Sequence, residues 1–187
     1  MQIIRSASYK RMPWKNGGGE TTEIAVSPPG ADFAAMGWRL SMATVAADGP
    51  FSSFPGIDRT LSVLSGTLGL DIGGARVDLM EMSPPHSFPG EAAVHGVVVR
   101  GPVTDLNVMT RREALRHDVR RIAVAGEKSV IVEPRTLVLF CQTGAVSLPT
   151  GETLQAFDTA IGETSGGAIV LKSAAPSTLY VITITPR

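Results

Sequence analysis

Short apolar runs, interrupted at close intervals by glycine and proline, are the feature that most limits how this chain can fold. Its 187 residues include 20 glycines and 13 prolines, and the runs between them are rich in β-branched residues and often alternate apolar with polar. Alternation places successive side chains on opposite faces of a strand, and frequent turn residues end each strand after a few positions. The pattern predicts an all-β sandwich or barrel in which helix is scarce.

The individual strands follow from the same pattern. Turn signals between them predict hairpins at Ser65-Gly66, Gly73-Gly74, Gly126-Glu127 and Thr150-Gly151, and only 111–117 fits a helical turn. The runs that fit strands are 20–27, 38–45, 60–64, 67–72, 75–79, 94–100, 105–110, 119–125, 129–133, 136–141, 144–148, 153–158, 168–172 and 177–185.

The segment that begins at Arg59 has an echo later in the chain. Arg59-Thr60-Leu61 leads through an apolar run to Ser65-Gly66, and Arg135-Thr136-Leu137 leads likewise to Thr143-Gly144. Two similar β halves suggest a duplicated jelly-roll-like unit, although chance similarity between strand-turn-strand units is the alternative. We expect one unit over 1–187, made of halves at about 1–115 and 116–187 that pack together.

Composition excludes several classes of protein. Lys plus Arg number 17, as do Asp plus Glu, which argues against a chain that coats nucleic acid or an anionic membrane. No run approaches the about 18 apolar residues of a membrane helix, and no apolar segment follows the first five residues. We therefore expect a soluble, cytoplasmic protein with neither nucleic acid nor membrane as its partner. The single Cys141 lies in an apolar run, which predicts a buried core thiol.

Metal and covalent chemistry find little support in the sequence. None of the three histidines, His86, His95 and His117, has another at a spacing that would put two imidazoles on one face of an element, so we expect no metal and no cofactor. No Gly-x-Ser-x-Gly elbow is present, and Cys141 has no electropositive neighbour that would lower its pKa. Catalysis by a covalent intermediate is disfavoured.

Three consecutive glycines, Gly17 to Gly19, lie in the segment that is richest in functional groups. Lys15 and Asn16 precede them, and Glu20 and an alternating run follow. Such a run permits a tight turn or bulge before the strand, or a close approach of the backbone to a ligand. It lacks the strand-to-helix setting and the Gly-Lys-Ser/Thr ending of a phosphate-binding loop, so nucleotide binding is not expected.

Two further segments carry polar residues in a pattern that suggests a pocket. Alternation over 105–111 puts Asp105, Asn107, Met109 and Arg111 on one face, which resembles the wet lining of a pocket more than a packed core. The segment 54–59 joins a Phe-Pro-Gly turn to Asp58-Arg59, which fits either a pocket or a local surface ion pair.

An arginine cluster begins at the end of the segment 105–111. Without interleaved aromatic residues or a reading helix, a solvated edge is favoured over contact with nucleic acid. Docking of a regulator or nucleic acid on this edge remains an alternative. The cluster consists of Arg111, Arg112, Arg116, Arg120 and Arg121.

Three segments together resemble the HutD/Ves family: 12–24, 38–59 and 101–111. The resemblance covers about the first 110 residues. It implies a cupin-like double β-barrel (bicupin) and a role linked to bacterial histidine utilisation. It further implies a non-catalytic protein that binds a small carboxylate metabolite, such as urocanate or formylglutamate, and moderates that pathway.

The resemblance also implies which residues bind this small anionic metabolite. Arginine offers a forked donor for a carboxylate, asparagine can contact amide or imidazole edges, and the two aromatic residues can form one side of the pocket. The matching positions are Trp14, Lys15, Asn16, Gly17, Gly18, Gly19, Glu20, Arg39, Phe54, Asp58, Arg59, Asp105, Asn107 and Arg111.

One alternative is an enzyme that acts on a histidine-pathway intermediate by metal-free acid-base chemistry. Asp58, Glu20 or Asp105 would then carry the proton, because a carboxyl group inside a barrel can have its pKa raised towards neutrality. Sequence leaves this alternative open. The strand edges and the balanced charge also leave room for a homodimer.

Overall fold

The computed structural model describes residues 1–15, 17–133 and 135–187, and it divides them into two compact units. Unit 1 comprises Met1–Tyr9 and His117–Pro186, and unit 2 comprises Lys10–Arg116 together with Arg187. Among the described residues the regular structure is strand apart from one turn of 3₁₀ helix, η1 (Ser6–Ser8), which confirms the all-β prediction. No helix in the described ranges has the length and apolar character needed to cross a membrane.

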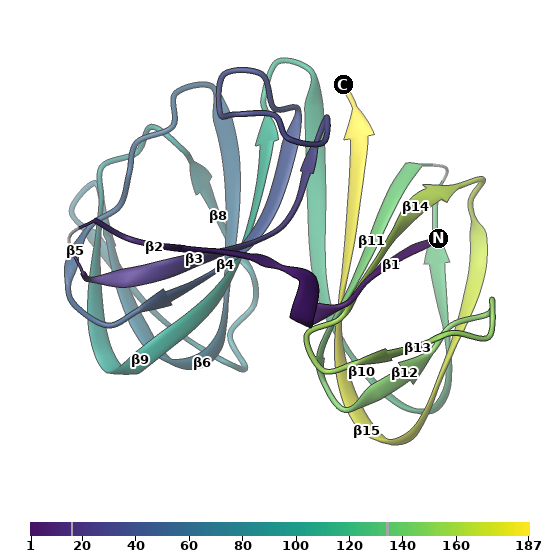
Figure 1. Cartoon of the computed structure of the whole chain (residues 1–187). Coiled ribbons are helices and arrows are strands. Elements are labelled where there is room, and N and C mark those ends of the chain that lie inside the picture. Colours follow the sequence, from purple (N-terminus) through teal and green to yellow (C-terminus); the bar gives the residue numbers. More distant parts are fainter. Residues whose placement is uncertain (16, 134) are drawn as a thin grey trace. The chain divides into compact units, whose positions relative to one another are not determined.

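Unit 2 is a strongly curved antiparallel sheet that closes on itself almost completely (Figure 1). Its central strands pair in the order β2-β3-β4-β9-β6-β7, with β5 added to β9 and β8 added to β6. The strands are β2 (Lys10–Pro13), β3 (Gly19–Ser27), β4 (Trp38–Val45), β5 (Gly49–Pro50), β6 (Ile57–Ile72), β7 (Ala75–Met80), β8 (His86–Pro89) and β9 (Val94–Arg111).

The interior of unit 2 is apolar in part and polar in part. Residues such as Leu61, Leu68 and Val103 are fully buried in its main hydrophobic cluster, and a smaller cluster contains Met36, Ile57 and Met109. Buried polar side chains occupy positions of β4, β6 and β9 as well, among them Arg39, Ser41, Arg59, Asp105 and Asn107. Buried charged groups are rare in cores unless they are paired or functional, so this part of the barrel is where a site is expected.

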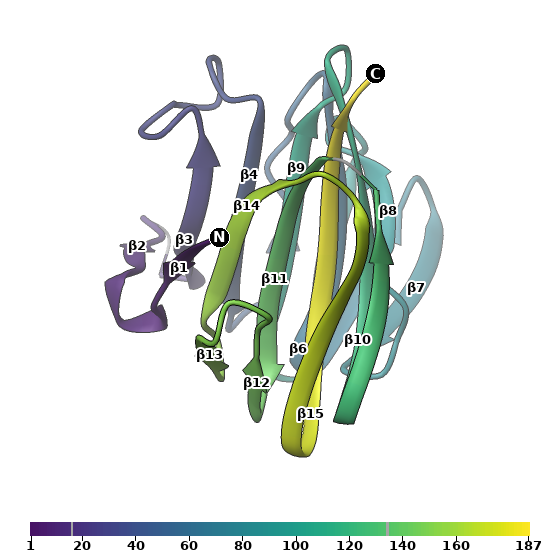
Figure 2. The same cartoon turned by 90° about the vertical axis from the view of Figure 1, so that its right-hand side faces the viewer.

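Unit 1 is a second antiparallel sheet, with the order β1-β14-β11-β15-β12-β13 and with β10 added to β15 (Figure 2). Its N-terminal arm is held by Tyr9, whose hydroxyl lies 2.6 Å from the Phe157 carbonyl oxygen and 2.7 Å from the Thr159 hydroxyl. The strands are β1 (Gln2–Ile4), β10 (Leu115–Val132), β11 (Arg135–Thr143), β12 (Ala145–Ser147), β13 (Thr153–Gln155), β14 (Thr159–Thr164) and β15 (Gly167–Pro186).

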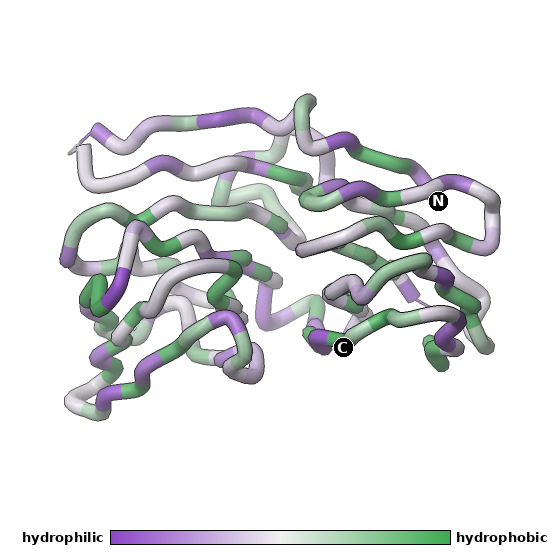
Figure 3. The backbone as a smooth tube through the Cα atoms, turned by 90° about the horizontal axis from the view of Figure 1, so that it is seen from below, coloured by the Kyte–Doolittle hydropathy of each residue, from purple (hydrophilic) through white to green (hydrophobic). Residues whose placement is uncertain are grey.

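The core of unit 1 is an apolar cluster that includes Leu139, Leu171 and Val181. Hydrophobic and hydrophilic positions alternate along many of the strands, as Figure 3 shows. Cys141 is fully buried in this cluster, which confirms the predicted core thiol, and burial raises the pKa of its thiol to about 11. A thiol in this state is a weak nucleophile at neutral pH.

The structure corrects several predicted boundaries. Four pairs of short predicted strands are single long strands, namely β6, β9, β10 and β15, so the hairpins predicted at Ser65-Gly66 and Gly126-Glu127 are wrong. In β6, Gly66 lies among register shifts against β9, which bend the strand without ending it.

Other predictions of turns and strands had mixed outcomes. The hairpins at Gly73-Gly74 and Thr150-Gly151 are confirmed. The predicted helical turn over 111–117 is wrong, because β9 continues to Arg111 and β10 begins at Leu115. Strands β1, β2, β5, β8 and β14 were not predicted.

Candidate binding pocket

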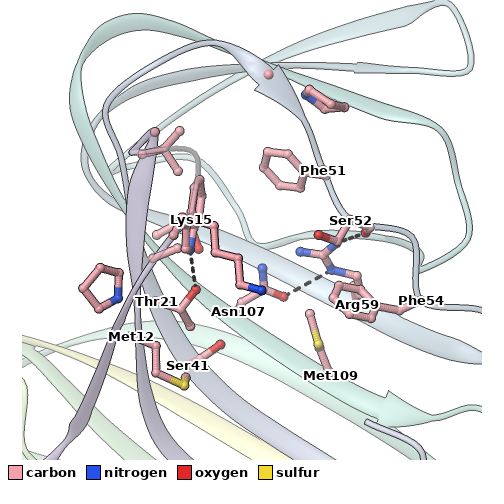
Figure 4. A pocket seen from close by; sticks show the side chains of 18 of the residues that line it. Met12, Lys15, Thr21, Ser41, Phe51, Ser52, Phe54, Arg59, Asn107 and Met109 are labelled. Atoms are coloured by element: carbon pink, nitrogen blue, oxygen red, sulfur yellow. Dashed lines mark hydrogen bonds between the residues drawn. The ribbon is translucent and has the colours of Figure 1, made fainter.

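A pocket of about 660 Å³ opens into the barrel of unit 2 (Figure 4). This volume suits a small metabolite, since ligand pockets commonly measure about 300–1,000 Å³. Three adjacent strands, β4, β9 and β6, form its floor, and residues 12–15, 18, 33, 47–52 and 54 line its walls. All of these residues belong to unit 2.

Strand register brings the polar residues of the floor together. Residues paired across antiparallel strands point to the same face, so each paired row contributes side chains to one side of the sheet. Arg39, Met109 and Arg59 form one row across β4, β9 and β6, and the next row along these strands contains Ser41 and Asn107. Asp105 follows in the third row, opposite Ala43. The alternation predicted over 105–111 is therefore the reason why Asp105, Asn107 and Met109 meet the pocket.

Arg59 is the principal cation of the pocket. Only 5% of the residue is exposed, and its guanidinium carbon lies 5.1–5.4 Å from the ring centres of Phe51, Phe54 and Phe88. Its hydrogen bonds are long, with 3.4 Å from Nε to Asn107 Oδ1 and 3.4 Å from a terminal nitrogen to the Ser52 carbonyl oxygen. No carboxylate lies within ion-pair distance of Arg59 in the part of the chain that the structure describes. Burial lowers the pKa of Arg59 to about 10, so it is still charged at neutral pH.

Asp105 is the acidic group of the floor. The residue is 1% exposed, and its Oδ1 has no hydrogen-bond partner among the described residues. Burial raises the pKa of this carboxyl to about 7, and the positive charge of Arg59 and a hydrogen bond with Asn107 oppose the increase. At neutral pH the group is therefore close to half protonated.

The glycine run positions one wall of the pocket. Trp14 Nε1 donates a hydrogen bond to the Thr21 hydroxyl at 2.8 Å, and the Trp14 backbone N–H donates to the Gly19 carbonyl at 2.9 Å. A β-carbon at Gly19 would collide with the Trp14 ring and with the Thr44 carbonyl oxygen, so the indole packs where only glycine leaves room. Lys15 extends from this segment across the pocket towards Asn107 (Figure 4).

The opposite wall is aromatic and is held by arginines. Arg39 Nε donates to Glu23 Oε2 at 2.8 Å, which neutralises its charge, and its guanidinium lies 5.1 Å from the ring centre of Phe33. Phe33 stacks on Phe54 with 4.6 Å between ring centres. Arg111 donates hydrogen bonds of 2.8–3.0 Å to the carbonyl oxygens of residues 33, 34 and 36, and so it holds the loop that carries Phe33.

Eight of the residues predicted for the site line this pocket: Trp14, Lys15, Gly18, Arg39, Phe54, Arg59, Asp105 and Asn107. Asn16 lies outside the described residues. The other five, Gly17, Gly19, Glu20, Asp58 and Arg111, are not among the lining residues that the structure describes.

Two of the candidate proton carriers lie away from the pocket. Glu20 is 3.7 Å from Arg11, and Asp58 pairs with Arg112 at 2.5 Å and with Arg187 at 3.1 Å. Arg112 also pairs with Glu91 at 2.6 Å. Proton transfer to a ligand in this pocket would therefore fall to Asp105.

Three of the five arginines in the cluster, Arg111, Arg112 and Arg120, are engaged by neighbouring groups. Arg111 binds loop carbonyl oxygens and Arg112 binds Asp58 and Glu91, while Arg120 lies 3.4 Å from Asp118. Guanidinium groups that are held in these contacts are not available to bind the phosphate groups of a nucleic acid.

Several lining residues were not predicted from sequence. Thr21 and Ser41 could have been predicted, because the alternation of β3 and β4 puts them on the same face as site residues already named. The other polar and aromatic residues among them lie in loops, where no periodic pattern applies. The polar and aromatic residues are Thr21, Phe33, Ser41, Asp48, Phe51 and Ser52. Among the described residues there is no group of three or more His, Cys, Asp or Glu placed to hold a metal.

Solved structures with the same architecture show which fold this is. YhhW of Escherichia coli superposes with a TM-score of 0.73 over 100% of this chain and 98% of its own, at 10% identity. A Cupin 2 conserved barrel domain protein of Leptotrichia buccalis gives 0.62 over 99% and 98%, at 7% identity. The fold is that of the cupin-like β-barrel proteins.

The chain belongs to the HutD family, whose family model matches residues 6–181. HutD of Pseudomonas fluorescens is 29% identical, with a TM-score of 0.86 over 100% of this chain and 98% of its own. Protein Ves of Citrobacter koseri is 36% identical over 74% of this chain and 73% of its own length. A Pseudomonas putida protein of the hutC 3′ region is 32% identical over 79% and 77%. These relatives link the family to histidine utilisation and confirm the resemblance found in the sequence.

Proposed function

We propose that this protein binds a small carboxylate metabolite of histidine utilisation in the unit 2 pocket, and that it moderates the pathway without transforming the ligand. The observation that carries the proposal is Arg59, a buried cation that lines the pocket and has no carboxylate within ion-pair distance among the described residues.

The charge of Arg59 favours an anion in the pocket. A buried charge is costly unless it is paired, and the three phenylalanine rings around the guanidinium offset only part of that cost. A ligand carboxylate can meet a guanidinium through two parallel hydrogen bonds, which are shorter and stronger than bonds between neutral groups. Lys15 provides a second positive charge on the same pocket.

The remaining lining suits a flat or extended ligand that carries polar groups. Trp14 on one wall and the stacked Phe33 and Phe54 on another provide apolar surfaces on which a planar conjugated ligand such as urocanate can lie. Asn107 and Ser41 supply polar groups for an amide or imidazole edge. One similar structure is that of HutD from Pseudomonas fluorescens in a formate condition, and formate is the smallest carboxylate.

Calorimetric titration of the whole chain tests the proposal. We expect saturable heat with at least one of urocanate, formylglutamate and formate, and none with imidazole or formamide, which match parts of these ligands but lack the negative charge. Histidine, which carries both a carboxylate and an ammonium, measures how well the pocket tolerates a second charge. No heat with any carboxylate, from a protein whose circular dichroism shows an intact fold, would contradict the proposal.

A second candidate function rests on Asp105. A buried carboxyl group that is close to half protonated at neutral pH and lines the pocket can give or take a proton from a ligand, as a general acid or base does. Loss of urocanate absorbance in the presence of the protein, abolished in Asp105→Asn, would favour an enzyme over a binder. Unchanged absorbance at saturating urocanate would exclude this reaction.

A further inference from the structure

Asp105 and a bound carboxylate would compete for one positive charge. Asp105 lines the same pocket as Arg59, and the charge of Arg59 acts on it directly. Its Oδ1 is buried without a hydrogen-bond partner among the described residues, so one oxygen of this carboxyl still lacks a donor.

Other charged groups around the pocket do not take the place of Arg59. On β4, Arg39 is already paired with Glu23 of β3. Lys15, in the segment before β3, lines the pocket but is an exposed residue, so water screens its charge. Asp48, after β4, accepts a hydrogen bond from the Val98 backbone N–H at 2.8 Å. Arg59 on β6 is therefore the buried, unpaired charge that both carboxyl groups would share.

Two carboxylates in a buried site next to one cation cannot both stay ionised. When two such groups share a site, one of them keeps its proton, which then bridges the pair as a short hydrogen bond. The ligand carboxylate takes the hydrogen bonds of Arg59, and Asp105 loses the charge that had favoured its ionised form.

We propose that a carboxylate ligand enters this pocket together with one proton from solvent, and that Asp105 holds this proton and donates it to the ligand through a hydrogen bond from its carboxyl group. The inference rests on the proposed function. It makes Asp105 the residue that selects a hydrogen-bond acceptor at this point of the ligand, and it couples carboxylate binding to pH. The step forms one O–H bond on Asp105 and leaves the ligand unchanged.

The direction in which pH changes the dissociation constant follows from the pKa of Asp105 in the free protein. The pKa of Asp105 is about 7 in the free pocket and rises further when the ligand neutralises Arg59. Binding therefore takes up little proton at pH 5, where Asp105 is already protonated, and about 0.9 proton per ligand at pH 8. The dissociation constant rises about fivefold between pH 7 and 8 and about tenfold per unit above that, until the pKa of the bound state is reached.

Calorimetry with formate measures this proton directly, because formate itself does not titrate between pH 5 and 9. The observed heat at pH 8 is compared in HEPES and Tris, whose ionisation enthalpies differ, and the slope gives the protons taken up. We expect close to one proton in the wild type and none in Asp105→Asn, which keeps a hydrogen-bond donor of the same shape. The matched control Asp71→Asn removes a half-exposed carboxylate from the same strand as Arg59 and should leave the uptake unchanged.

Different results would overturn the uptake of a proton by Asp105 and the binding of a carboxylate. Formate heat that is independent of the buffer, or uptake that persists in Asp105→Asn, would overturn it and leave the proposed function standing. No heat with formate, urocanate or formylglutamate in any buffer would overturn both. Should Asp105→Asn fail to fold, the ¹³C chemical shift of the Asp105 carboxyl in the wild type provides the answer, since its apparent pKa must rise on addition of formate; an unchanged or lower value would overturn the inference.

Discussion

Replacing Arg59 by glutamine lowers the affinity for a carboxylate ligand by at least about thirtyfold. Loss of one member of a buried charge pair costs about 2–5 kcal/mol, and 2 kcal/mol corresponds to a factor of about thirty. Glutamine retains a polar side chain that can still face Asn107 and the Ser52 carbonyl. The loss of affinity therefore measures the missing charge and the missing parallel N–H donors of the guanidinium more than the space that the shorter side chain leaves. The measurement is calorimetric titration with whichever carboxylate binds the wild type.

Arg76→Gln is the matched control for this variant. Arg76 lies in the same unit, on β7, where its half-exposed side chain pairs with Asp71 and Asp78 away from the pocket. Its replacement removes the same charge and should leave the dissociation constant within a factor of about two, because exposed ion pairs contribute little. Equal affinities of Arg59→Gln and wild type would remove Arg59 from the site.

Replacing Gly66 by alanine destabilises the fold by about 2–5 kcal/mol, the sum of an unfavourable backbone conformation and a steric clash. Gly66 has φ of +83°, and a β-carbon there would lie 2.6 Å from the Arg100 carbonyl oxygen and 3.0 Å from that of Pro102. Both contacts are with backbone of β9, which cannot rotate away as a flexible side chain can. The free energy of unfolding, measured in urea, gives the loss.

Gly74→Ala separates the two contributions. Gly74 also has positive φ, at +89°, but nothing lies within 4 Å of the position its β-carbon would take. This variant bears only the conformational cost, about 1–2 kcal/mol. Equal losses in the two variants would show that the close approach of β6 and β9 at Gly66 does not contribute.

The alternation of apolar and polar residues predicted strands well, and it predicted their lengths poorly. The bounds of β4 agree with the prediction, because ordinary turn residues flank it. In β6 the prediction placed a hairpin at Ser65-Gly66, where the structure has bulges inside one strand of 16 residues. A glycine at positive φ produces the same local sequence signal in a bulge and in a hairpin, and only the pairing with β9 distinguishes them.

The site was predicted where it follows from periodicity and was missed where it depends on loops. Asp105 and Asn107 face the pocket as the alternation of β9 requires, and Arg59 faces it from β6. Neighbours along a strand point to opposite faces, so Asp58 lies outside, where Arg112 and Arg187 bind it. Alternation also puts Arg111 on the face of β9 that carries Asp105 and Asn107. Its side chain, however, donates hydrogen bonds to carbonyl oxygens of the loop before β4.

Three expectations from the sequence stay predictions. The internal duplication suggested by the segments at Arg59 and Arg135, the cytoplasmic location and the homodimer each depend on evidence beyond strand pairing. The cupin-like fold and the link to histidine utilisation do not depend on them.

A crystal structure of the protein grown with formate or urocanate would show directly whether a carboxylate binds at Arg59. We expect density for the ligand in the unit 2 pocket, with both carboxylate oxygens within hydrogen-bonding distance of the Arg59 guanidinium and one of them close to Asp105. A carboxylate bound at the arginines of 111–121, with the Arg59 pocket empty at a ligand concentration that saturates the calorimetric signal, would contradict it.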